Sequence, residues 1–460
     1  MTYDVAVVGG GPAGYAAALK GARLGAKVIL FEAGKVGGTC LNVGCIPTKC
    51  LVTQAELIER IRLGTQKGIF RDAGQFSYKK IHEEQERVVA RLTGGVSALL
   101  KAAGVTVVQA EARFIDAHTL RASGQEYKAK KTIVATGSKN MVLPLPGIDG
   151  GNVLDSTAAL ALTRLPRSIV IVGAGVVGME FASAFCALGS EVTAVDVLPA
   201  LLPGEDHEAA DALQKQMEAH GVRFSLGARV LSISDEQGQK CVTIEKDSQQ
   251  QKLYGEYVLV ATGRAPAGTA AAELGLKTDK KGFIIVDFEM KTSVEDVYAA
   301  GDVIGGYLLA HSAYAEAETA VSNCMGKSER VRLDVMPRCI FTLPGLAAVG
   351  LTGAKAEEAG GIVTGKFPFS ASGKAMAGGM EAGFVKWVAH RETGELLGCT
   401  ILGAESAELL SAATVAVNCK ATVGDFEKMI FAHPTLSESI KEAALDCAGN
   451  ALHLPGRRRS

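Results

Sequence analysis

The sequence predicts an α/β protein with two domains of one plan, followed by an α+β domain at the C-terminus. A glycine-rich turn follows a short apolar strand twice, first at Gly9 and again at Gly173. From residue 335 onward, apolar and polar side chains alternate as in an antiparallel sheet. At 460 residues the chain is too long for a single core. We therefore expect about three or four domains.

The first unit has the features of a dinucleotide site. Its strand, helix and second strand are expected at residues 3–8, 15–24 and 26–31. Gly9, Gly11 and Gly14 hold the G-x-G-x-x-G positions, which allow a tight turn, close approach to a pyrophosphate and close helix packing. Glu32 ends the second strand and is placed to bind a ribose hydroxyl. The glycine spacing alone is weak evidence for a dinucleotide site. The preceding strand, the following helix and the acid make the prediction specific.

The second unit repeats this plan. Its strand, helix and second strand are expected at residues 168–172, 179–188 and 191–195. Its motif glycines are Gly173, Gly175 and Gly178. The second strand ends in Asp196, whose carboxylate accepts a hydrogen bond from a free ribose 2′-OH and repels a 2′-phosphate. Residues 197–201 contain no Arg or Lys, so we predict NAD rather than NADP. The duplication itself predicts two Rossmann-like domains.

The other elements follow from their apolar patterns. We expect long amphipathic helices over 55–101 with a connection near 64–78, and strands near 105–108, 112–115, 120, 132–138, 257–264 and 297–302. Two of these strands end in an A-T-G turn, at 135–137 and 261–263. A surface connection is expected at 265–272 and a helix at 308–323. The C-terminal domain is expected to have strands at 347–349, 362–369, 384–388 and 396–402, with helices at 406–417 and 438–445.

Two cysteines stand close together in the glycine-rich stretch 37–50. Four residues separate Cys40 from Cys45, and Pro47 suits the first turn of a helix. Cys45 is then expected at or just before a helix N-terminus, whose partial positive charge stabilises a thiolate. Lys49 follows one turn later on the same face. A zinc site would need a second cysteine pair or nearby histidines, and the sequence has neither. We interpret the pair as a redox-active disulfide.

Composition argues against several other functions. The formal net charge of −1 gives no electrostatic case for nucleic acid or an anionic membrane, and no apolar run is long enough to span a bilayer. Met1 leads almost directly into the first strand, so we expect no signal peptide and a cytoplasmic protein. The cysteines outside the close group, Cys419 included, are interpreted as buried or partly buried side chains. The basic tail 457–459 is interpreted as a solvated end.

Two dinucleotide sites and a redox disulfide together predict an electron relay. One dinucleotide gives or takes hydride, and the disulfide gives or takes two electrons. Nicotinamide and thiols exchange electrons poorly by direct contact, so a flavin is expected between them. The cysteine pair directly follows the first glycine unit, which assigns FAD to that unit and NAD(H) to the second.

Several motifs together resemble a known family. They are G-G-T-C-L-N-V-G-C-I-P-T-K at 37–49, both glycine motifs, both A-T-G turns, A-G-D at 300–302 and H-P-T-L-S-E at 433–438. This order resembles the class I flavin-dependent pyridine nucleotide-disulfide oxidoreductases, and among them the dihydrolipoamide dehydrogenases, over nearly the whole chain. The resemblance implies an FAD-binding domain (1–143), an NAD-binding domain (144–264), a central segment completing the FAD domain (265–333) and a dimerisation domain (334–460). It also implies a homodimer with active sites shared between subunits.

The resemblance assigns roles to the reacting residues. It implies that Cys45 is the sulfur next to the flavin and that Cys40 exchanges with substrate. It further implies that the partner subunit's His433 is the acid–base, held by Glu438. An isolated histidine would be interpreted as a helix cap or a core residue. A carboxylate five residues later and a redox disulfide upstream favour catalysis, because a histidine oriented by an acid can take a proton near neutral pH.

Further residues are implied to contact the cofactors, and we expect no metal site. Lys49 and Glu180 are implied to pair near the flavin and the nicotinamide. The other positions implied for FAD are Gly9, Gly11, Pro12, Ala13, Gly14, Glu32, Gly38, Thr39, Ala112, Thr136, Gly137, Ser138, Asp302 at the ribityl chain, and Leu309, Ala310 and His311 by the ring. Those implied for NAD are Gly173, Gly175, Val176, Val177, Gly178, Asp196, Val230 and Gly263.

The implied reaction is oxidation of a protein-bound dihydrolipoyl group by NAD+ through the disulfide and FAD. The carrier would belong to a 2-oxoacid dehydrogenase complex or a glycine cleavage system. The alternative is an NAD(P)H-dependent reductase of another small disulfide. Glutathione-type reductases would need basic residues after the second strand, and mercuric reductases a C-terminal cysteine pair; this chain has neither. A redox-silent scaffold would not need both cysteines together with His433 and Glu438.

Three positions depart from the family pattern. Residues 265–269 read Ala-Pro-Ala-Gly-Thr where a Pro-Asn-Thr run is usual, Ala112 replaces a glycine, and Phe431 stands where a histidine is common. None belongs to the reacting groups. We therefore expect them to affect cofactor affinity or partner contacts rather than the chemistry.

Overall fold

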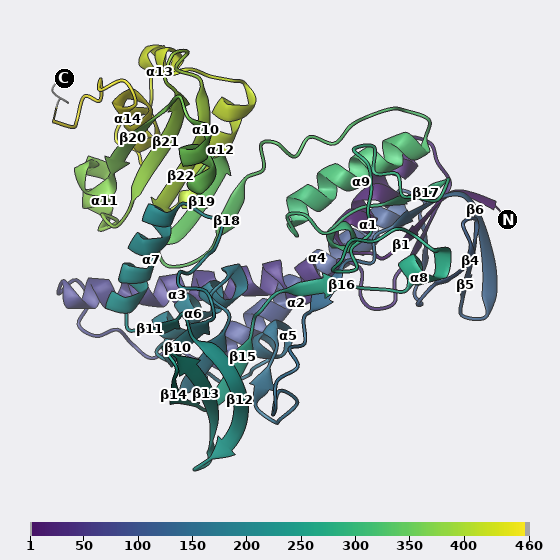
Figure 1. The fold of residues 1–460 in the computed structure, drawn as a ribbon, viewed down its shortest axis with the longest axis horizontal. Helices are drawn as coiled ribbons and strands as arrows, with labels where there is room; N and C mark the ends of the chain where they lie inside the picture. The colour runs from purple at the N-terminus through teal and green to yellow at the C-terminus, as the bar shows by residue number, and fades with distance from the viewer. Residues whose placement is uncertain (1, 456–460) are drawn as a thin grey trace.

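The computed structural model describes residues 2–455, so the basic tail at 457–459 lies outside the described residues. Two α/β units, each with parallel strands at the centre of its sheet, and a C-terminal unit with an antiparallel sheet make up the chain (Figure 1). The α/β class and its two units of one plan are confirmed. Among residues 2–455, no helix is both long enough and apolar enough to cross a membrane.

The first unit is built on a seven-stranded sheet. Its strands are β1 (Thr2–Val8), β2 (Val28–Phe31), β3 (Thr106–Val108), β4 (Arg113–Asp116), β5 (Thr119–Ala122), β6 (Gln125–Val134) and β17 (Val297–Ala299). β1 runs parallel to β2 and β6, with Val7 opposite Leu30 and Ile133. β17 also pairs with β6, although the whole second unit separates them in sequence. Helices α1 (Pro12–Arg23) and α9 (Ala310–Cys324) pack together over this apolar sheet.

The second unit repeats the arrangement with five parallel strands in the order β11-β10-β9-β15-β8. They are β8 (Val153–Leu154), β9 (Ser168–Val172), β10 (Glu191–Asp196), β11 (Arg223–Leu226) and β15 (Tyr257–Val260), with α5 (Ser156–Leu160), α6 (Val176–Leu188) and α7 (His207–Ala219). α6 begins three residues earlier than predicted because Gly175 is its N-cap. An antiparallel sheet, β12 (Arg229–Glu236), β13 (Gln239–Lys246) and β14 (Gln249–Gly255), adjoins it.

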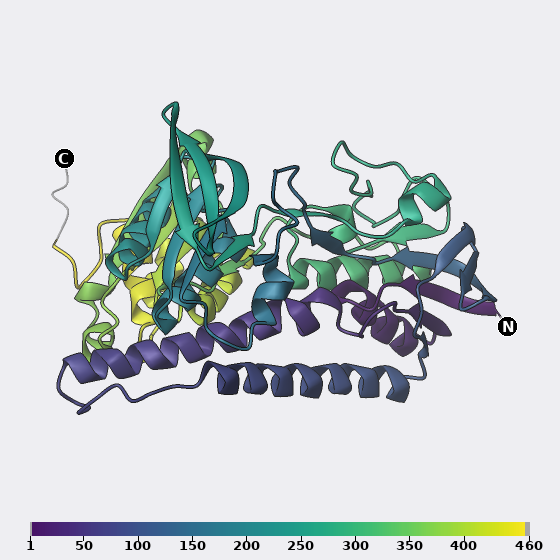
Figure 2. The same cartoon turned by 90° about the horizontal axis from the view of Figure 1, so that it is seen from below.

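Two long helices support the site, as predicted. α3 (Cys45–Gln66) and α4 (Tyr78–Ala102) lie side by side along one edge of the molecule (Figure 2), and the short α2 (Gly38–Val43) precedes them. α3 packs against α4 on one side and against α6 of the second unit on the other. The start of α3 is thereby held between the two units.

The C-terminal unit is a five-stranded antiparallel sheet in the order β18-β19-β22-β21-β20. Its strands are β18 (Arg338–Ile340), β19 (Gly345–Gly350), β20 (Ile362–Pro368), β21 (Phe384–His390) and β22 (Leu396–Gly403), and its helices are α10 (Ala354–Ala359), α11 (Gly373–Gly378), α12 (Ser406–Asn418), α13 (Val423–Lys428) and α14 (Glu438–Asp446). The buried Trp387 anchors α14, because its ring N–H donates to the Ile440 carbonyl at 2.9 Å.

Two sequence-based expectations were wrong. The stretch 265–272 is not a plain surface connection, because β16 (Arg264–Pro266) pairs there with β7 (Ser138–Asn140) and α8 (Ala270–Leu274) follows. Cys419 is exposed, since it caps the C-terminus of α12 at the surface.

Candidate redox active site

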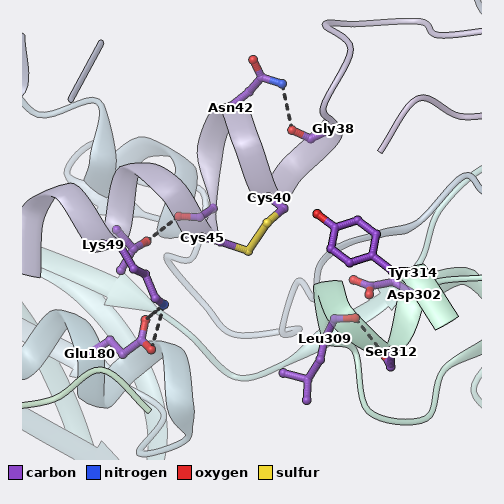
Figure 3. Close-up of a disulfide and its surroundings, with 12 residues drawn as sticks. Gly38, Cys40, Asn42, Cys45, Lys49, Glu180, Asp302, Leu309, Ser312 and Tyr314 are labelled. Atoms are coloured by element: carbon purple, nitrogen blue, oxygen red, sulfur yellow. Dashed lines mark hydrogen bonds and ion pairs between the residues drawn. A yellow bond between two sulfur atoms is a disulfide. The ribbon is translucent and has the colours of Figure 1, made fainter. Parts of the chain in front are cut away.

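A disulfide joins Cys40 in α2 to Cys45, the first residue of α3 (Figure 3). Their Cα atoms are 4.6 Å apart, and Gly44 connects the two helices. The predicted pairing and the predicted place of Cys45 at a helix N-terminus are confirmed. A thiolate on Cys45 would be stabilised by the free N–H groups of that helix end.

Lys49 and Glu180 form an ion pair one turn below the disulfide (Figure 3). Lys49 Nζ lies 2.8 and 3.0 Å from the two carboxylate oxygens of Glu180, whose side chain is 6% exposed. The Phe341 N–H also donates to Glu180 Oε1 at 3.0 Å, and Lys49 Nζ lies 4.3 Å from the centre of the Phe341 ring. The cation and the backbone donor offset part of the cost of burying this carboxylate. This pair ties α3 to α6.

The glycine turns of both units form cradles that fit a dinucleotide pyrophosphate. Gly9 has φ +104°, and a methyl group there would overlap the Ala135 carbonyl. A methyl group on Gly14 would overlap the Gly9 carbonyl, and one on Gly38 would lie 2.6 Å from Gly11 Cα. The second unit has the same crowding at its first and third motif glycines. Both turns therefore expose backbone at a helix N-terminus, where a phosphate binds.

The acids at the ends of β2 and β10 occupy equivalent positions. Glu32 accepts hydrogen bonds from the N–H groups of Gly10 and Gly34, both at 2.6 Å. Asp196 accepts from the N–H groups of Ala174 at 2.6 Å and Leu198 at 2.8 Å. Each carboxylate ties its strand end to the middle of the adjacent glycine turn. Both side chains are partly exposed, so they can still accept a ribose hydroxyl.

A further group lies across the disulfide from Lys49. Figure 3 places Asp302, Leu309 and Tyr314 there, at and before the N-terminal turns of α9. Asp302 Oδ2 accepts from the Ser138 hydroxyl at 2.5 Å. The hydroxyls of Tyr314 and Tyr15 are 2.6 Å apart, which links α9 to α1, and burial raises the pKa of Tyr15. A ring bound between these residues would face the disulfide.

The remaining residues implied for FAD lie in the first unit or in α9, which packs over its sheet. Ala310 begins α9, and His311 Nε2 donates to the Pro337 carbonyl at 2.7 Å. Thr136 donates its hydroxyl to the Ala267 carbonyl at 2.7 Å. Ala112 is buried in the first unit just before β4, so its methyl group is accommodated by the core.

The second unit holds its remaining implied residues beside the glycine turn. Val176 and Val177 form the exposed first turn of α6. Gly263 follows β15 with φ +125°, and Val230 lies in β12.

His433, which precedes α14, forms a hydrogen-bonded pair with Glu438, the first residue of that helix. His433 Nδ1 lies 2.9 Å from Glu438 Oε1, and Glu438 Oε2 accepts from the Thr435 N–H at 2.8 Å. Burial raises the pKa of Glu438, but the hydrogen bonds from Thr435 and His433 outweigh it, so the pKa is lowered. Nδ1 therefore donates to a carboxylate and leaves Nε2 as the free base.

This pair does not meet the disulfide within one chain. His433 is 79% exposed. α14 lies at the far end of the C-terminal unit from α2 (Figure 1).

Three contributors had no assigned role in the sequence-based prediction: Phe341, Tyr314 and Arg264. Phe341 acts through its backbone N–H, which no side-chain pattern reveals. Arg264 follows the second A-T-G turn, and that repeat is the one signal that could have drawn attention to it. Among residues 2–455, no group of three or more His, Cys, Asp or Glu side chains is arranged to hold a metal ion.

Comparison with known proteins agrees with this geometry. Residues 3–317 match the family described as pyridine nucleotide-disulphide oxidoreductase, and residues 336–444 match its dimerisation domain. A dihydrolipoyl dehydrogenase of Thermus scotoductus is 40% identical over 99% of this chain and 100% of its own length. A dihydrolipoyl dehydrogenase of Bacillus subtilis is 38% identical over 98% of this chain and 99% of its own.

Solved structures show the same fold. LpdA from Mycobacterium tuberculosis superposes with a TM-score of 0.89 at 29% identity, over 96% of this chain and 99% of that one. The HOCl-induced flavoprotein disulfide reductase RclA from Escherichia coli superposes with a TM-score of 0.87 at 29% identity, over 96% of this chain and 99% of that one. The chain belongs to the pyridine nucleotide-disulphide oxidoreductases.

Proposed function

We propose that this protein is a dihydrolipoyl dehydrogenase, which oxidises a protein-bound dihydrolipoyl group to the lipoyl disulfide with NAD+. The observation that carries the proposal is the Cys40–Cys45 disulfide at the start of α3, held between two dinucleotide cradles. Relatives named dihydrolipoyl dehydrogenase support it, because they align with nearly the whole chain. The proposed domain limits are 1–143, 144–264, 265–333 and 334–460, and the pairing of β17 with β6 supports joining the third segment to the first.

The enzyme uses FAD and NAD(H). The first glycine turn, Glu32 and Asp302 would hold FAD, and the second glycine turn and Asp196 would hold NAD(H). When bound, FAD supplies a two-electron relay between nicotinamide and disulfide. Lys49, held in place by Glu180, would present its ammonium group to the bound cofactors.

Disulfide exchange begins at Cys40. A lipoyl thiolate attacks Cys40 Sγ, the Cys40–Cys45 bond breaks, and Cys45 leaves as a thiolate at the helix N-terminus. The second lipoyl thiol loses its proton to His433 and attacks the lipoyl sulfur bound to Cys40, which releases Cys40. The dihydrolipoyl group has then lost two electrons and two protons. These two electrons and one of the two protons convert NAD+ to NADH, and the other proton is released to solvent.

The partner's His433 serves as the proton acceptor. Its Nε2 is free because Nδ1 donates to Glu438, and this orientation suits a base that faces another subunit. The dimerisation domain at 336–444 supports a homodimer whose sites combine Cys40 of one chain with the partner's His433.

The carrier and the compartment complete the proposal. A lipoyl group on a separate protein of a 2-oxoacid dehydrogenase complex or a glycine cleavage system is the proposed substrate. A cytoplasmic location is supported by cysteines such as Cys50, Cys241 and Cys399, which form no disulfide, as expected in a reducing compartment.

Steady-state rates test the proposal. The holoenzyme is assayed with dihydrolipoamide and NAD+, and in the reverse sense with glutathione disulfide and NADH or NADPH. Dihydrolipoamide with NAD+ is expected to be the preferred pair by orders of magnitude in kcat/KM. A higher kcat/KM with glutathione disulfide and NADPH would instead favour the reductase of another small disulfide.

A further inference from the structure

Arg264 belongs to the second unit but binds the first. It follows β15 and the second A-T-G turn and begins β16. β16 runs antiparallel to β7, with Arg264 opposite Asn140. β7 in turn follows the first A-T-G turn. The two duplicated turns therefore lead into strands that join the two units.

The guanidinium of Arg264 forms three hydrogen bonds with β7. Nε donates to the Ser138 hydroxyl at 2.6 Å, and Nη2 donates to the Ser138 carbonyl at 2.8 Å. Nη1 donates to Asn140 Oδ1 at 2.9 Å. The side chain is 20% exposed. A rigid planar fork makes all three bonds at once, which a lysine ammonium cannot do.

The hydrogen bond from Arg264 determines where the Ser138 hydroxyl donates its hydrogen. A guanidinium can only donate, so Ser138 Oγ accepts from Arg264 and its single hydrogen is left for Asp302 Oδ2, 2.5 Å away. Arg264 Nε is itself 3.6 Å from the same oxygen, which adds electrostatic attraction. Asp302 Oδ1 has no hydrogen bond to any of residues 2–455 and is left for a ligand hydroxyl.

The backbone beside Asp302 is fixed from the opposite side. Glu316 of α9 is 2% exposed, and its Oε2 accepts from the Gly301 N–H at 2.8 Å. Gly301 has φ +79°, and a methyl group there would lie 2.8 Å from the Ala13 side chain in the first turn of α1. Asp302 thus has a fixed backbone, and its side-chain torsion is the remaining freedom.

We propose that Arg264, a residue of the NAD-binding half, completes the FAD site by orienting Asp302 through the Ser138 hydroxyl. Arg264 is a positioning residue, because it acts on FAD through Asp302. The inference rests on the proposed function, in which Asp302 binds a hydroxyl of FAD. Retention of FAD then depends on contact between the two units.

FAD binding to the apoprotein tests this inference without turnover. FAD is removed from Arg264→Gln, Asp302→Asn and the double variant, and the Kd for added FAD is measured by quenching of flavin fluorescence. Loss of a charge-assisted contact predicts about a tenfold increase in Kd for Arg264→Gln. Because both residues act on one contact, the double variant is expected to bind FAD no more weakly than Asp302→Asn alone. Lys139→Gln removes a charge from an exposed neighbour in β7 and is expected to leave Kd unchanged.

Each outcome has a separate meaning. If the effects of Arg264→Gln and Asp302→Asn multiply, Arg264 stabilises the fold without orienting Asp302, and the inference is overturned. An unchanged Kd in Arg264→Gln overturns it as well. If Asp302→Asn leaves Kd unchanged, the assignment of Asp302 to FAD in the proposed function fails first. Restoration of tight binding by Arg264→Lys would contradict the requirement for a planar fork.

Discussion

The two sulfurs of the disulfide lie in unlike surroundings. Cys45 begins α3 and is next to the helix N–H groups, whereas Cys40 lies within α2. The helix end favours negative charge on Cys45 after the bond opens, and Cys40 becomes the sulfur that exchanges. This asymmetry follows from one glycine, Gly44, which separates the two helices.

Replacing Cys40 tests this division. Cys40→Ser is expected to abolish turnover of dihydrolipoamide and to leave FAD bound, because no FAD-binding group is removed. The Cys45 thiolate should then give a long-wavelength absorbance beside the oxidised flavin. Rates with NAD+ and the visible spectrum measure both effects. Cys50→Ser is the matched control, since Cys50 is a free thiol on the same helix. Turnover surviving in Cys40→Ser would refute the assigned exchange sulfur.

Glu316 predicts a pH dependence of stability. Burial, with a smaller contribution from Asp302, raises the pKa of Glu316 to about 7, against the hydrogen bond from Gly301. The unfolded chain ionises this group near its ordinary 4.5, while the folded protein keeps the proton, so wild-type stability falls between these pH values as pH rises. Glu316→Gln cannot ionise and so lacks this loss. Its free energy of unfolding should therefore rise relative to that of wild type by on the order of 3 kcal/mol between pH 4.5 and 7.5.

Urea unfolding of the holoenzyme at both pH values measures the Glu316 effect. The matched control is Glu318→Gln, because Glu318 is exposed on the same helix and pairs with Lys20. A difference between variant and wild type that does not change with pH would contradict the prediction.

Single residues were predictable where a motif fixed their neighbours. Cys40, Cys45 and Lys49 lie within one short stretch, so local helix geometry decides how they meet. The ion pair between Lys49 and Glu180 was implied by resemblance alone, since 131 residues separate them. The N–H of Phe341 and the fork of Arg264 act across distant segments through backbone or hydroxyl partners, and no local pattern encodes those contacts.

Strand ends carry the cofactor chemistry in both α/β units. β2 and β10 each end in a carboxylate that receives two backbone N–H groups, one from the glycine turn and one from two residues later. The carboxylates therefore stabilise the loops as well as face the ribose. This double role explains why each acid follows its motif glycines by the same number of residues in both α/β units.

Asp196 at the end of β10 should determine the choice of nicotinamide cofactor. Asp196→Ala is expected to narrow the ratio of kcat/KM for NADH over NADPH by about tenfold, because it removes a ribose acceptor and a negative charge. Both cofactors should also bind more weakly, since the Ala174 N–H loses its partner. The ratio is therefore the quantity to measure. Glu191→Ala, at the exposed start of the same strand, is the control and should leave this ratio unchanged. An unchanged ratio in Asp196→Ala would show that Asp196 does not bind the ribose.

Elements with strong local periodicity were predicted well. The βαβ units, α4 and four of the five strands of the C-terminal sheet lie close to their expected ranges, whereas no strand was predicted at β18. No strands were predicted for the β12–β14 sheet. Its three strands carry many charged and polar residues and are joined by short turns, so they lack a clear apolar pattern. β16 and α8 were mistaken for a surface connection, since an alanine- and glycine-rich stretch forms a strand only where β7 provides a partner.

Within one chain the disulfide and the His433–Glu438 pair lie in different units. The disulfide lies between the α/β units, whereas α14, which follows His433 in the chain, lies at the far end of the C-terminal unit (Figure 1). The His433 side chain is 79% exposed. In a two-fold dimer each interface patch is used twice, so a shared site of the kind proposed above would occur twice. The exposed Ile430, three residues before His433, fits a loop that is covered by a second chain.

Heterodimers can test whether the sites are shared. A dimer of one Cys40→Ser chain and one His433→Ala chain keeps one site with both residues intact, so about half of wild-type activity is expected. Its control pairs a wild-type chain with a chain that carries both substitutions, which leaves no intact site. Two affinity tags allow each heterodimer to be purified after co-expression. Activity in the control and none in the first dimer would show that each site uses one chain alone.

The return of β17 to the first sheet has a consequence for biosynthesis. β6 and β17 are neighbours, yet about 160 residues separate them, so this contact has a very high sequence separation. A ribosome must translate the complete second unit before the first sheet can receive its last strand and Asp302. The second unit, whose strands all lie between residues 153 and 260, can complete its parallel sheet first. The nascent chain should therefore acquire its nicotinamide site before it can retain flavin.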